Sequence, residues 1–195
     1  ASADVTIGNT NSGDITFSRT DAAAVLAGNA GDLAYIFGGS ATFKSGGGND
    51  AFQLGAGDTT IKNTTAAETI TFHTGNFTLQ DNADLNIVTN AGAITVQNIY
   101  GTAGSSTNDV TLNAGSSTTS IGIVDTDIND LTVSGTGVIT LTGDITTADT
   151  AAGGNDGATA DDGSQSYSGA VVLSGGNITL TTGGGGASFS SSINS

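Results

Sequence analysis

The chain contains no proline, cysteine, methionine or tryptophan, and it has only three basic residues. The absence of cysteine excludes disulfides, thiolate metal sites and a cysteine nucleophile. Because 18 acidic residues stand against Arg19, Lys44 and Lys62, the formal net charge is -15. Nucleic acids and anionic membranes are bound through lysine and arginine, so we expect neither as a partner. No apolar run approaches the roughly 18 residues of a transmembrane helix, so we expect no membrane insertion.

Glycine, with 31 residues, and threonine are abundant in this chain of 195 residues. Threonine, valine, isoleucine and phenylalanine favour strands, and glycine supplies turns. We therefore expect one β-rich domain spanning residues 1–195. The richness in Asp, Asn, Thr, Gly and Ala, with little Lys, resembles bacterial secreted surface proteins. This resemblance implies an extracellular or cell-surface location.

A nine-residue period runs through residues 37–61. Gly39, Gly48 and Gly57 recur at this spacing, and so do Phe43, Phe52 and Ile61, a series that Ile70 continues. Each unit reads as a glycine-rich turn followed by a short strand. Such a strand cannot bury its apolar face alone, so we expect successive copies to stack in a solenoid.

A second recurring unit is an apolar–Thr–apolar triplet, often preceded by Asp or Asn. Examples are Val5-Thr6-Ile7, Ile15-Thr16-Phe17, Ile94-Thr95-Val96, Val110-Thr111-Leu112 and Leu131-Thr132-Val133. Alternation with a period of two indicates strands with one apolar face. We predict an all-β fold, a β-solenoid resembling a right-handed β-helix with Gly- and Asn-rich turns. Three strands a coil would give roughly seven coils. An antiparallel β-sandwich is the alternative, because its strands recur at similar intervals.

Two segments depart from these patterns. Residues 20–34 contain an alanine-rich run that predicts a short helical cap over one end of the strands. Residues 148–169 hold almost no apolar side chains and predict a long surface loop inserted between strands. Neither segment indicates a second domain.

The stretch Gly46-Gly47-Gly48-Asn49-Asp50-Ala51-Phe52 resembles the calcium-binding nonapeptide of RTX proteins. Asp50 occupies the aspartate position of that motif and Phe52 the apolar position. The resemblance covers residues 37–61 and implies that stacked turns hold Ca²⁺. Asn49, Asp50 and Asp58 are the candidate ligands here.

Two further acidic clusters are candidate calcium sites. Asp125, Asp127 and Asp130 form a D-x-D-x-x-D pattern that places several oxygens within one tight turn. The other cluster lies in the expected loop and comprises Asn155, Asp156, Asp161 and Asp162. Calcium takes about 6–8 oxygen ligands, which an Asp-rich loop and its carbonyls supply. Alternatively, Asp and Asn at these places make turns and keep the surface soluble.

Residues 163–195 resemble the repeat units of filamentous-haemagglutinin-like secreted proteins. The resemblance rests on a "SYSG" turn, an "AVVL" strand, an "NITLTT" strand and a "GASFSSSINS" strand. Members of that family are right-handed β-helical adhesins and exoproteins. The resemblance implies surface attachment or a fibre, with host or matrix glycans as possible binding partners.

Catalytic patterns are scarce in this sequence. His73 is the single histidine, and one histidine among many hydroxyls does not make a triad. We therefore expect no enzyme; a polysaccharide-active β-helix enzyme and an ice-binding protein with threonine rows are distant alternatives. A calcium-dependent surface-layer or RTX-type adhesin is the nearer one.

Open strand edges at both ends of a solenoid invite pairing, and this chain has no proline to block it. We therefore expect copies of the chain to associate end to end or edge to edge. An extracellular structural or adhesive module that forms a filament, or part of a long fibre, is the predicted function.

Overall fold

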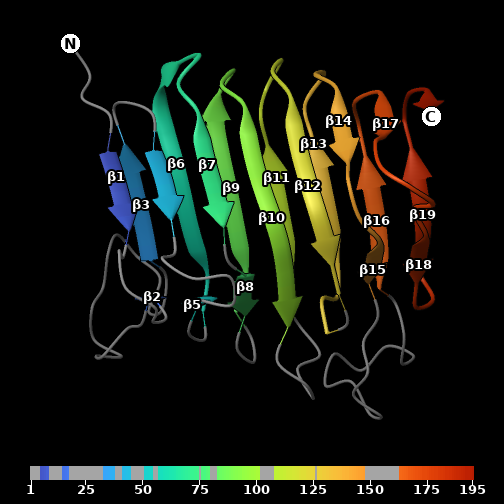
Figure 1. Ribbon diagram of the computed structural model, residues 1–195, viewed down its shortest axis with the longest axis horizontal. Coiled ribbons are helices and arrows are strands. Elements are labelled where there is room, and N and C mark those ends of the chain that lie inside the picture. Colours follow the sequence, from blue (N-terminus) through green and yellow to red (C-terminus); the bar gives the residue numbers. More distant parts are fainter. Residues whose placement is uncertain are drawn as a thin grey trace.

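The computed structural model describes residues 5–8, 15–17, 33–37, 41–44, 51–54, 57–74, 76–79, 83–101, 108–125, 127–147 and 163–195. These residues form strands and connections, with no helix among them. Every strand pairing is parallel, and successive passes of the chain stack into a β-solenoid. Figure 1 shows the strands side by side along the longest axis of the molecule, from blue at one end to red at the other.

The strands fall into three stacks, and each stack takes one strand from successive coils. Stacks 1 and 2 belong to a 13-stranded sheet and are joined by the long strands β10 (Ile94–Gly101) and β12 (Thr119–Val124). Stack 1 also contains β1 (Val5–Gly8), β4 (Ala41–Lys44), β7 (Ile70–Thr74), β14 (Ile139–Leu141), β17 (Val171–Leu173) and β20 (Ile193–Asn194). Stack 2 also contains β2 (Ile15–Phe17), β5 (Ala51–Leu54), β8 (Asn76–Leu79), β15 (Ile145–Thr147) and β18 (Leu180–Thr182).

Stack 3 is a separate 7-stranded sheet, with one strand for each complete coil. It contains β3 (Leu33–Phe37), β6 (Thr59–Ala66), β9 (Leu85–Asn90), β11 (Val110–Asn113), β13 (Leu131–Ser134), β16 (Ser164–Tyr167) and β19 (Gly186–Phe189). The seven strands agree with the coil number expected from chain length. The antiparallel sandwich alternative is wrong, because all the pairings are parallel.

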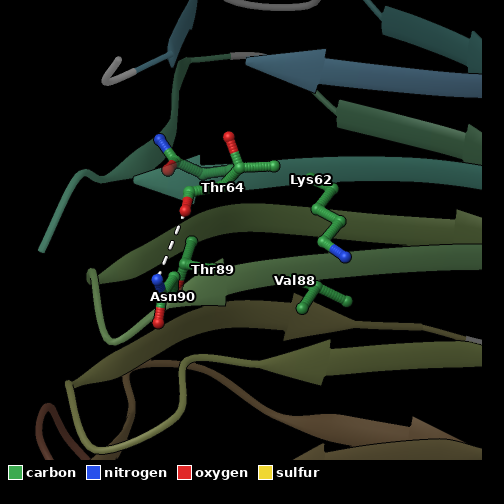
Figure 2. Close-up of a pocket in the computed structure, with 6 residues that line it drawn as sticks. Lys62, Thr64, Val88, Thr89 and Asn90 are labelled. Atoms are coloured by element: carbon green, nitrogen blue, oxygen red, sulfur yellow. Dashed lines mark hydrogen bonds between the residues drawn. The ribbon is translucent and has the colours of Figure 1, made fainter. Parts of the chain in front are cut away.

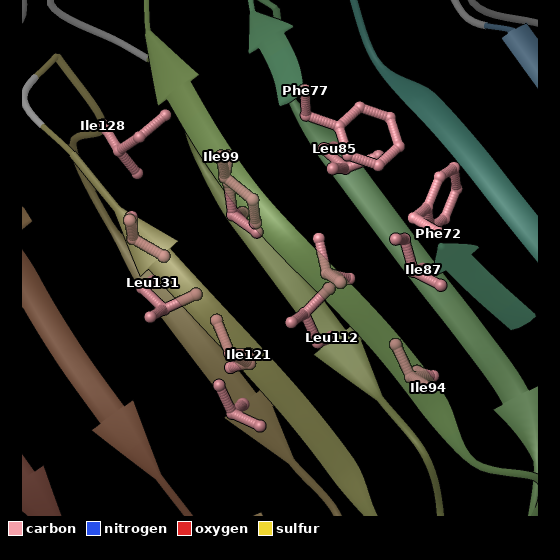
Figure 3. Close-up of a cluster of buried hydrophobic side chains, with 14 of the residues drawn as sticks. Phe72, Phe77, Leu85, Ile87, Ile94, Ile99, Leu112, Ile121, Ile128 and Leu131 are labelled. Carbon is pink, nitrogen blue, oxygen red and sulfur yellow. The ribbon is translucent and has the colours of Figure 1, made fainter. Parts of the chain in front are cut away.

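The core consists of in-register columns of apolar side chains that point into the solenoid. In stack 3, one column runs through the buried residues Ile61, Ile87, Leu112, Val133 and Tyr167. The residues between them, such as Thr111 and Thr132, are half-buried on the outer face. Figure 3 shows Ile94, Leu112 and Ile121 within this apolar cluster. Each fully buried Leu or Ile contributes about 1.5–3 kcal/mol, so the columns supply the main stabilisation.

The turns after the stack 3 strands repeat the same backbone conformation. Ala67 and Ala91 have φ values of 64° and 58° at equivalent places, and Gly115 has a φ of 60° in the turn of the next coil. One position after Ala91 the coils approach closely: a Cβ on Gly92 would overlap the carbonyl oxygen of Glu68. A Cβ on Gly137, further along the same column, would overlap that of Ser117. Glycine is therefore required where one turn lies directly on the next.

The nine-residue units do not stack on one another as expected. Phe43, Phe52 and Ile61 lie in β4, β5 and β6, which belong to stacks 1, 2 and 3. Their partners are in neighbouring coils, as in the pairing of Ile61 with Tyr35 and Ile87. The nine-residue period is therefore the step from one stack to the next within a coil, whereas stacking joins residues 20 to 37 positions apart.

The two irregular segments are only partly described. Leu33 and Ala34, at the end of the expected helical cap 20–34, lie in strand β3, and residues 20–32 lie outside the described residues. The expected loop 148–169 extends too far, because Ser164–Tyr167 is strand β16 with Gln165 and Tyr167 buried. Residues 148–162 lie outside the described residues.

Candidate functional site

An aspartate precedes each of four successive strands of stack 3. We call Asp58, Asp84, Asp109 and Asp130 the aspartate ladder; they precede β6, β9, β11 and β13. The strands that follow pair in register, so the four residues lie one above another on consecutive coils. Neighbouring parallel strands lie about 4.8 Å apart, which sets the spacing of the ladder. The repulsion between like charges at this spacing must be offset by favourable interactions of the carboxylates.

Hydrogen bonds between coils provide part of this compensation. The backbone N–H of Asp109 donates to Oδ1 of Asp84 (2.9 Å), and that of Asp130 donates to Oδ1 of Asp109 (3.2 Å). At the end of the ladder, Ser164 donates to Oδ1 of Asp130 from its backbone N (2.8 Å) and its hydroxyl (2.7 Å). Each of these three carboxylates therefore ties its own coil to the next one.

The inner members of the ladder have raised pKa values, chiefly because they are partly buried. Burial raises the pKa of Asp84 to about 6, and the neighbouring Asp109 and Asp58 add to the effect. Burial also raises the pKa of Asp109, while the hydrogen bond from Asn129 Nδ2 (3.0 Å) opposes the rise. The Asp84 carboxyl is therefore poised to take up a proton in mildly acidic solution.

The predicted calcium ligands are distributed over several coils. Asp58 and Asp130 lie in the ladder, separated by Asp84 and Asp109. Within the part of the chain that the structure describes, no three His, Cys, Asp or Glu side chains are grouped to hold a metal ion. The structure thus does not assemble Asp125, Asp127 and Asp130 into one ligand set. Asn49 and Asp50, like the loop cluster at 155–162, lie outside the described residues.

Asp127 belongs instead to a buried polar cluster around Asn108. Asp127 has a φ of 67° and is 6% exposed, and its carbonyl oxygen accepts a hydrogen bond from Asn108 Nδ2 (3.4 Å). The same amide donates to Leu79 O (3.4 Å), and Asn108 Oδ1 accepts from the N–H of Ala83 (2.9 Å). One buried asparagine therefore fastens three coils together. Asp125 lies after β12, where its N–H donates to Ile99 O (3.0 Å).

Gln165 forms a second buried polar cluster within the solenoid. Its Nε2 donates to the carbonyl oxygens of Thr181 (2.8 Å) and Ile145 (3.2 Å), and its Oε1 accepts from the Tyr167 hydroxyl (2.9 Å). Burial raises the pKa of Tyr167 above its usual range, so this hydroxyl stays protonated and remains a donor. Sequence reasoning missed both residues, because it assigned them to a surface loop. The alternation of Gln165 and Tyr167 with serines was the signal for a strand.

A small groove lies where β6 bulges against β9. Two extra residues of β6 stand opposite β9 between Lys62 and Ala66, and the groove there has a volume of about 340 Å³. It is lined by Lys62, Asn63, Thr64, Val88, Thr89 and Asn90. Figure 2 shows Asn90 Nδ2 donating to the carbonyl oxygen of Thr64 (3.2 Å) across it. The lining contains no carboxylate, so it lacks the acid–base pair that hydrolysis of a glycan requires.

A column of hydroxyl side chains runs along the outer face of stack 1. Thr71, Thr95, Ser120 and Thr140 occupy equivalent register positions and are half-buried. Val172 follows them on the next coil. The column offers hydrogen-bonding groups at strand spacing. Within the described strands the column is one residue wide.

The C-terminal end of the solenoid exposes part of the core. Among the side chains that the structure describes, the hydrophobic residues that pack against the core while only partly buried are Leu173, Ile178, Leu180 and Phe189, all in the last coil. Phe189 stacks on Tyr167, with ring centroids 5.0 Å apart and planes 12° apart. Among the described strands, β18 and β19 have no partner on their outer side. This end therefore combines open backbone edges with uncovered apolar side chains.

These features define a parallel β-solenoid with an aspartate ladder and an uncovered end. His73 lies in strand β7. No described helix is long and apolar enough to cross a membrane. Comparisons with protein-family models, curated proteins and solved structures give no match for this chain.

Proposed function

We propose that this protein is an extracellular structural module of a bacterial surface fibre or adhesin, and that copies associate end to end. The observation that carries the proposal is the apolar C-terminal end, where Leu180 and Phe189 stay partly exposed while equivalent side chains in inner coils are buried. A surface of this kind, with unpaired strand edges beside it, favours association with another strand-bearing surface.

The absence of charged side chains from the last coil also supports end-to-end association. Soluble monomers usually protect strand edges with lysine, proline or inward-pointing charges. Residues 163–195 contain no charged side chain and no proline. The last coil therefore lacks the usual features that prevent edge-to-edge pairing.

Two neighbouring residues of β18 provide the test. Leu180 is half-buried and in register with the buried Ile145, whereas Thr181 is exposed. Leu180→Asn should shift the sedimentation profile toward monomer, because it places a polar amide in the apolar contact between two copies. Thr181→Asn, the matched control, should retain the assemblies.

Circular dichroism of both variants checks that the strands remain formed. A wild-type chain that stays monomeric in light scattering at high concentration, with or without calcium, would contradict the proposal. Calcium binding at Asn49 and Asp50 remains a separate prediction.

A further inference from the structure

The three stacks of the solenoid do not have the same number of strands. Stacks 2 and 3 contain seven strands each, whereas stack 1 contains eight, because β20 adds one strand beyond the last complete coil. A second copy that stacks on β18 and β19 in the direction of the chain therefore brings its own first strand, β1, to the level of β20. Only one of these two strands can pair with β17.

The register positions favour β1 over β20 as the partner of β17. Val5 and Ile7 of β1 share their register columns with the buried Ile70 and Phe72. Strand β20 consists of two residues and presents one apolar side chain, Ile193, which is 51% exposed. A four-residue strand with two apolar residues offers more main-chain hydrogen bonds and more apolar surface to β17 than a two-residue strand with one apolar residue.

Stack 3 shows a similar continuity between the two ends. The register column of Ile61 begins at Tyr35 on β3 and ends at Phe189 on β19. Tyr167 already stacks on Phe189 with a centroid distance of 5.0 Å. Continuing this column by one coil places Tyr35 of the next copy beside Phe189, a second aromatic pair at strand spacing. In stack 2 the same step brings Ile15 beside Leu180.

The distribution of charge makes a second copy a suitable partner. Residues 63–162 contain twelve acidic and no basic residues, whereas residues 163–195 contain neither kind. All three basic residues, Arg19, Lys44 and Lys62, lie in the N-terminal third, together with six of the acidic residues. Because one of the two ends that meet is uncharged, the contact avoids the repulsion expected between two strongly acidic surfaces.

We propose that copies join by strand exchange: β2 and β3 of one copy pair with β18 and β19 of another, and its β1 displaces β20 from β17. This joint rests on the proposed end-to-end association and specifies its register. It makes a heterologous contact that repeats without closing, so the product is a filament of parallel strands.

Cysteine pairs test the register directly, because the chain has no cysteine of its own. In the proposed joint, Ser188 of one copy lies beside Ala34 of the next copy, within the distance that a disulfide spans. The double variant Ala34→Cys with Ser188→Cys should give a ladder of covalent oligomers on oxidation. Ile36→Cys with Ser188→Cys, which reports a two-residue slip, should not, and each single variant should give dimers at most.

A second pair tests the exchange of strands. If β1 takes the place of β20, Thr6 lies beside Val172, so Thr6→Cys with Val172→Cys should crosslink. If β1 instead adds outside β20, Thr6→Cys with Asn194→Cys should crosslink, and the exchange is wrong. Removing residues 193–195 should leave assembly intact or increase it, whereas removing residues 1–8 should abolish it.

Light scattering on the uncrosslinked protein distinguishes failure of the proposed joint from failure of end-to-end association. Assemblies that form without the Ala34–Ser188 crosslink would refute this joint and leave end-to-end association standing. Absence of assemblies would refute the association itself, and the joint with it.

Discussion

The hydroxyl of Tyr167 donates a hydrogen bond to Oε1 of Gln165 across 2.9 Å, between two buried side chains on one face of strand β16. Gln165 in turn donates to carbonyl oxygens of stack 2, so the pair links two stacks through the interior of the solenoid. Two polar side chains inside an apolar core are tolerated because they satisfy each other.

Tyr167→Phe should therefore destabilise the protein. The variant keeps the ring that stacks on Phe189 but leaves Oε1 of Gln165 without its donor, which costs about 1–3 kcal/mol in a buried site. Urea denaturation measures the change in the free energy of unfolding. Ser166→Ala, on the outer face of the same strand, is the control and should change it little. Equal effects in both variants would show that the hydrogen bond is unimportant.

Alanine substitution at two glycines should show where close contact between coils requires a glycine. A Cβ at Gly137 would overlap the carbonyl oxygen of Ser117, whereas a Cβ at Gly176 meets no atom within 4 Å. Gly137→Ala should lower stability by roughly 1–3 kcal/mol, because backbone atoms must move apart. Gly176→Ala should be neutral or slightly stabilising. Thermal denaturation compares the two, and a neutral Gly137→Ala would contradict the close packing of these turns.

Stability should fall as the pH rises through the titration range of Asp84. Burial and the neighbouring carboxylates raise the pKa of this carboxyl to about 6 in the folded protein, above its ordinary value of 3.8. The folded state therefore binds the proton more tightly, and the stabilisation by protonation is complete below about pH 4 and lost above about pH 6. Melting temperatures at pH 4.5 and 7.5 should show the difference.

Two substitutions of Asp84 assign this effect to its charge. Asp84→Asn keeps an oxygen for the N–H of Asp109 and removes the charge, so it should stabilise the protein at pH 7.5 by about 1 kcal/mol after solvent screening. Asp84→Ala removes the acceptor as well and should be less stable than Asp84→Asn at both pH values. A pH dependence unchanged by Asp84→Asn would mean that other groups cause it.

Calcium should act through the nonapeptide-like segment rather than the 125–130 cluster. We expect millimolar calcium to raise the melting temperature and a chelator to reverse it, since a ligand bound by the folded state alone stabilises that state. Asp50→Ala should remove this response. Asp127→Asn should retain it, because Asp127 is buried and its carbonyl oxygen accepts a hydrogen bond from Asn108. An identical melting curve with calcium and chelator would refute calcium binding.

The strands were predictable because their patterns are local. In Leu131-Thr132-Val133 the alternation alone indicates which residues are buried, and the structure confirms it. The pairing partners were not predictable, because coil length changes from 20 residues between Thr119 and Ile139 to 36 between Val5 and Ala41. Connections of different length leave no constant period in the sequence.

The aspartate ladder was visible in the sequence only in part. Local motifs single out Asp58 and Asp130 as metal ligands, whereas Asp84 and Asp109 are two of the many Asp and Asn residues that precede an apolar strand triplet. Their relation depends on register between coils, which brings residues 21 to 26 positions apart into line. Buried Asn108 and Gln165 were missed for a related reason. Their hydrogen-bond partners lie in other coils, so the local sequence gives no sign that an interior amide is satisfied.

The backbone hydrogen bonds that join the coils run along the long axis of the rod, so a pulling force on its two ends acts on one coil at a time. Each coil that detaches releases its own length of chain, for example the 22 residues from Val171 to Ile193 or the 32 residues from Ile139 to Val171. At about 3.3–3.6 Å a residue, these lengths differ by tens of ångströms. Stretching one molecule should therefore give a series of unequal extension steps, whose order records which coil yields first.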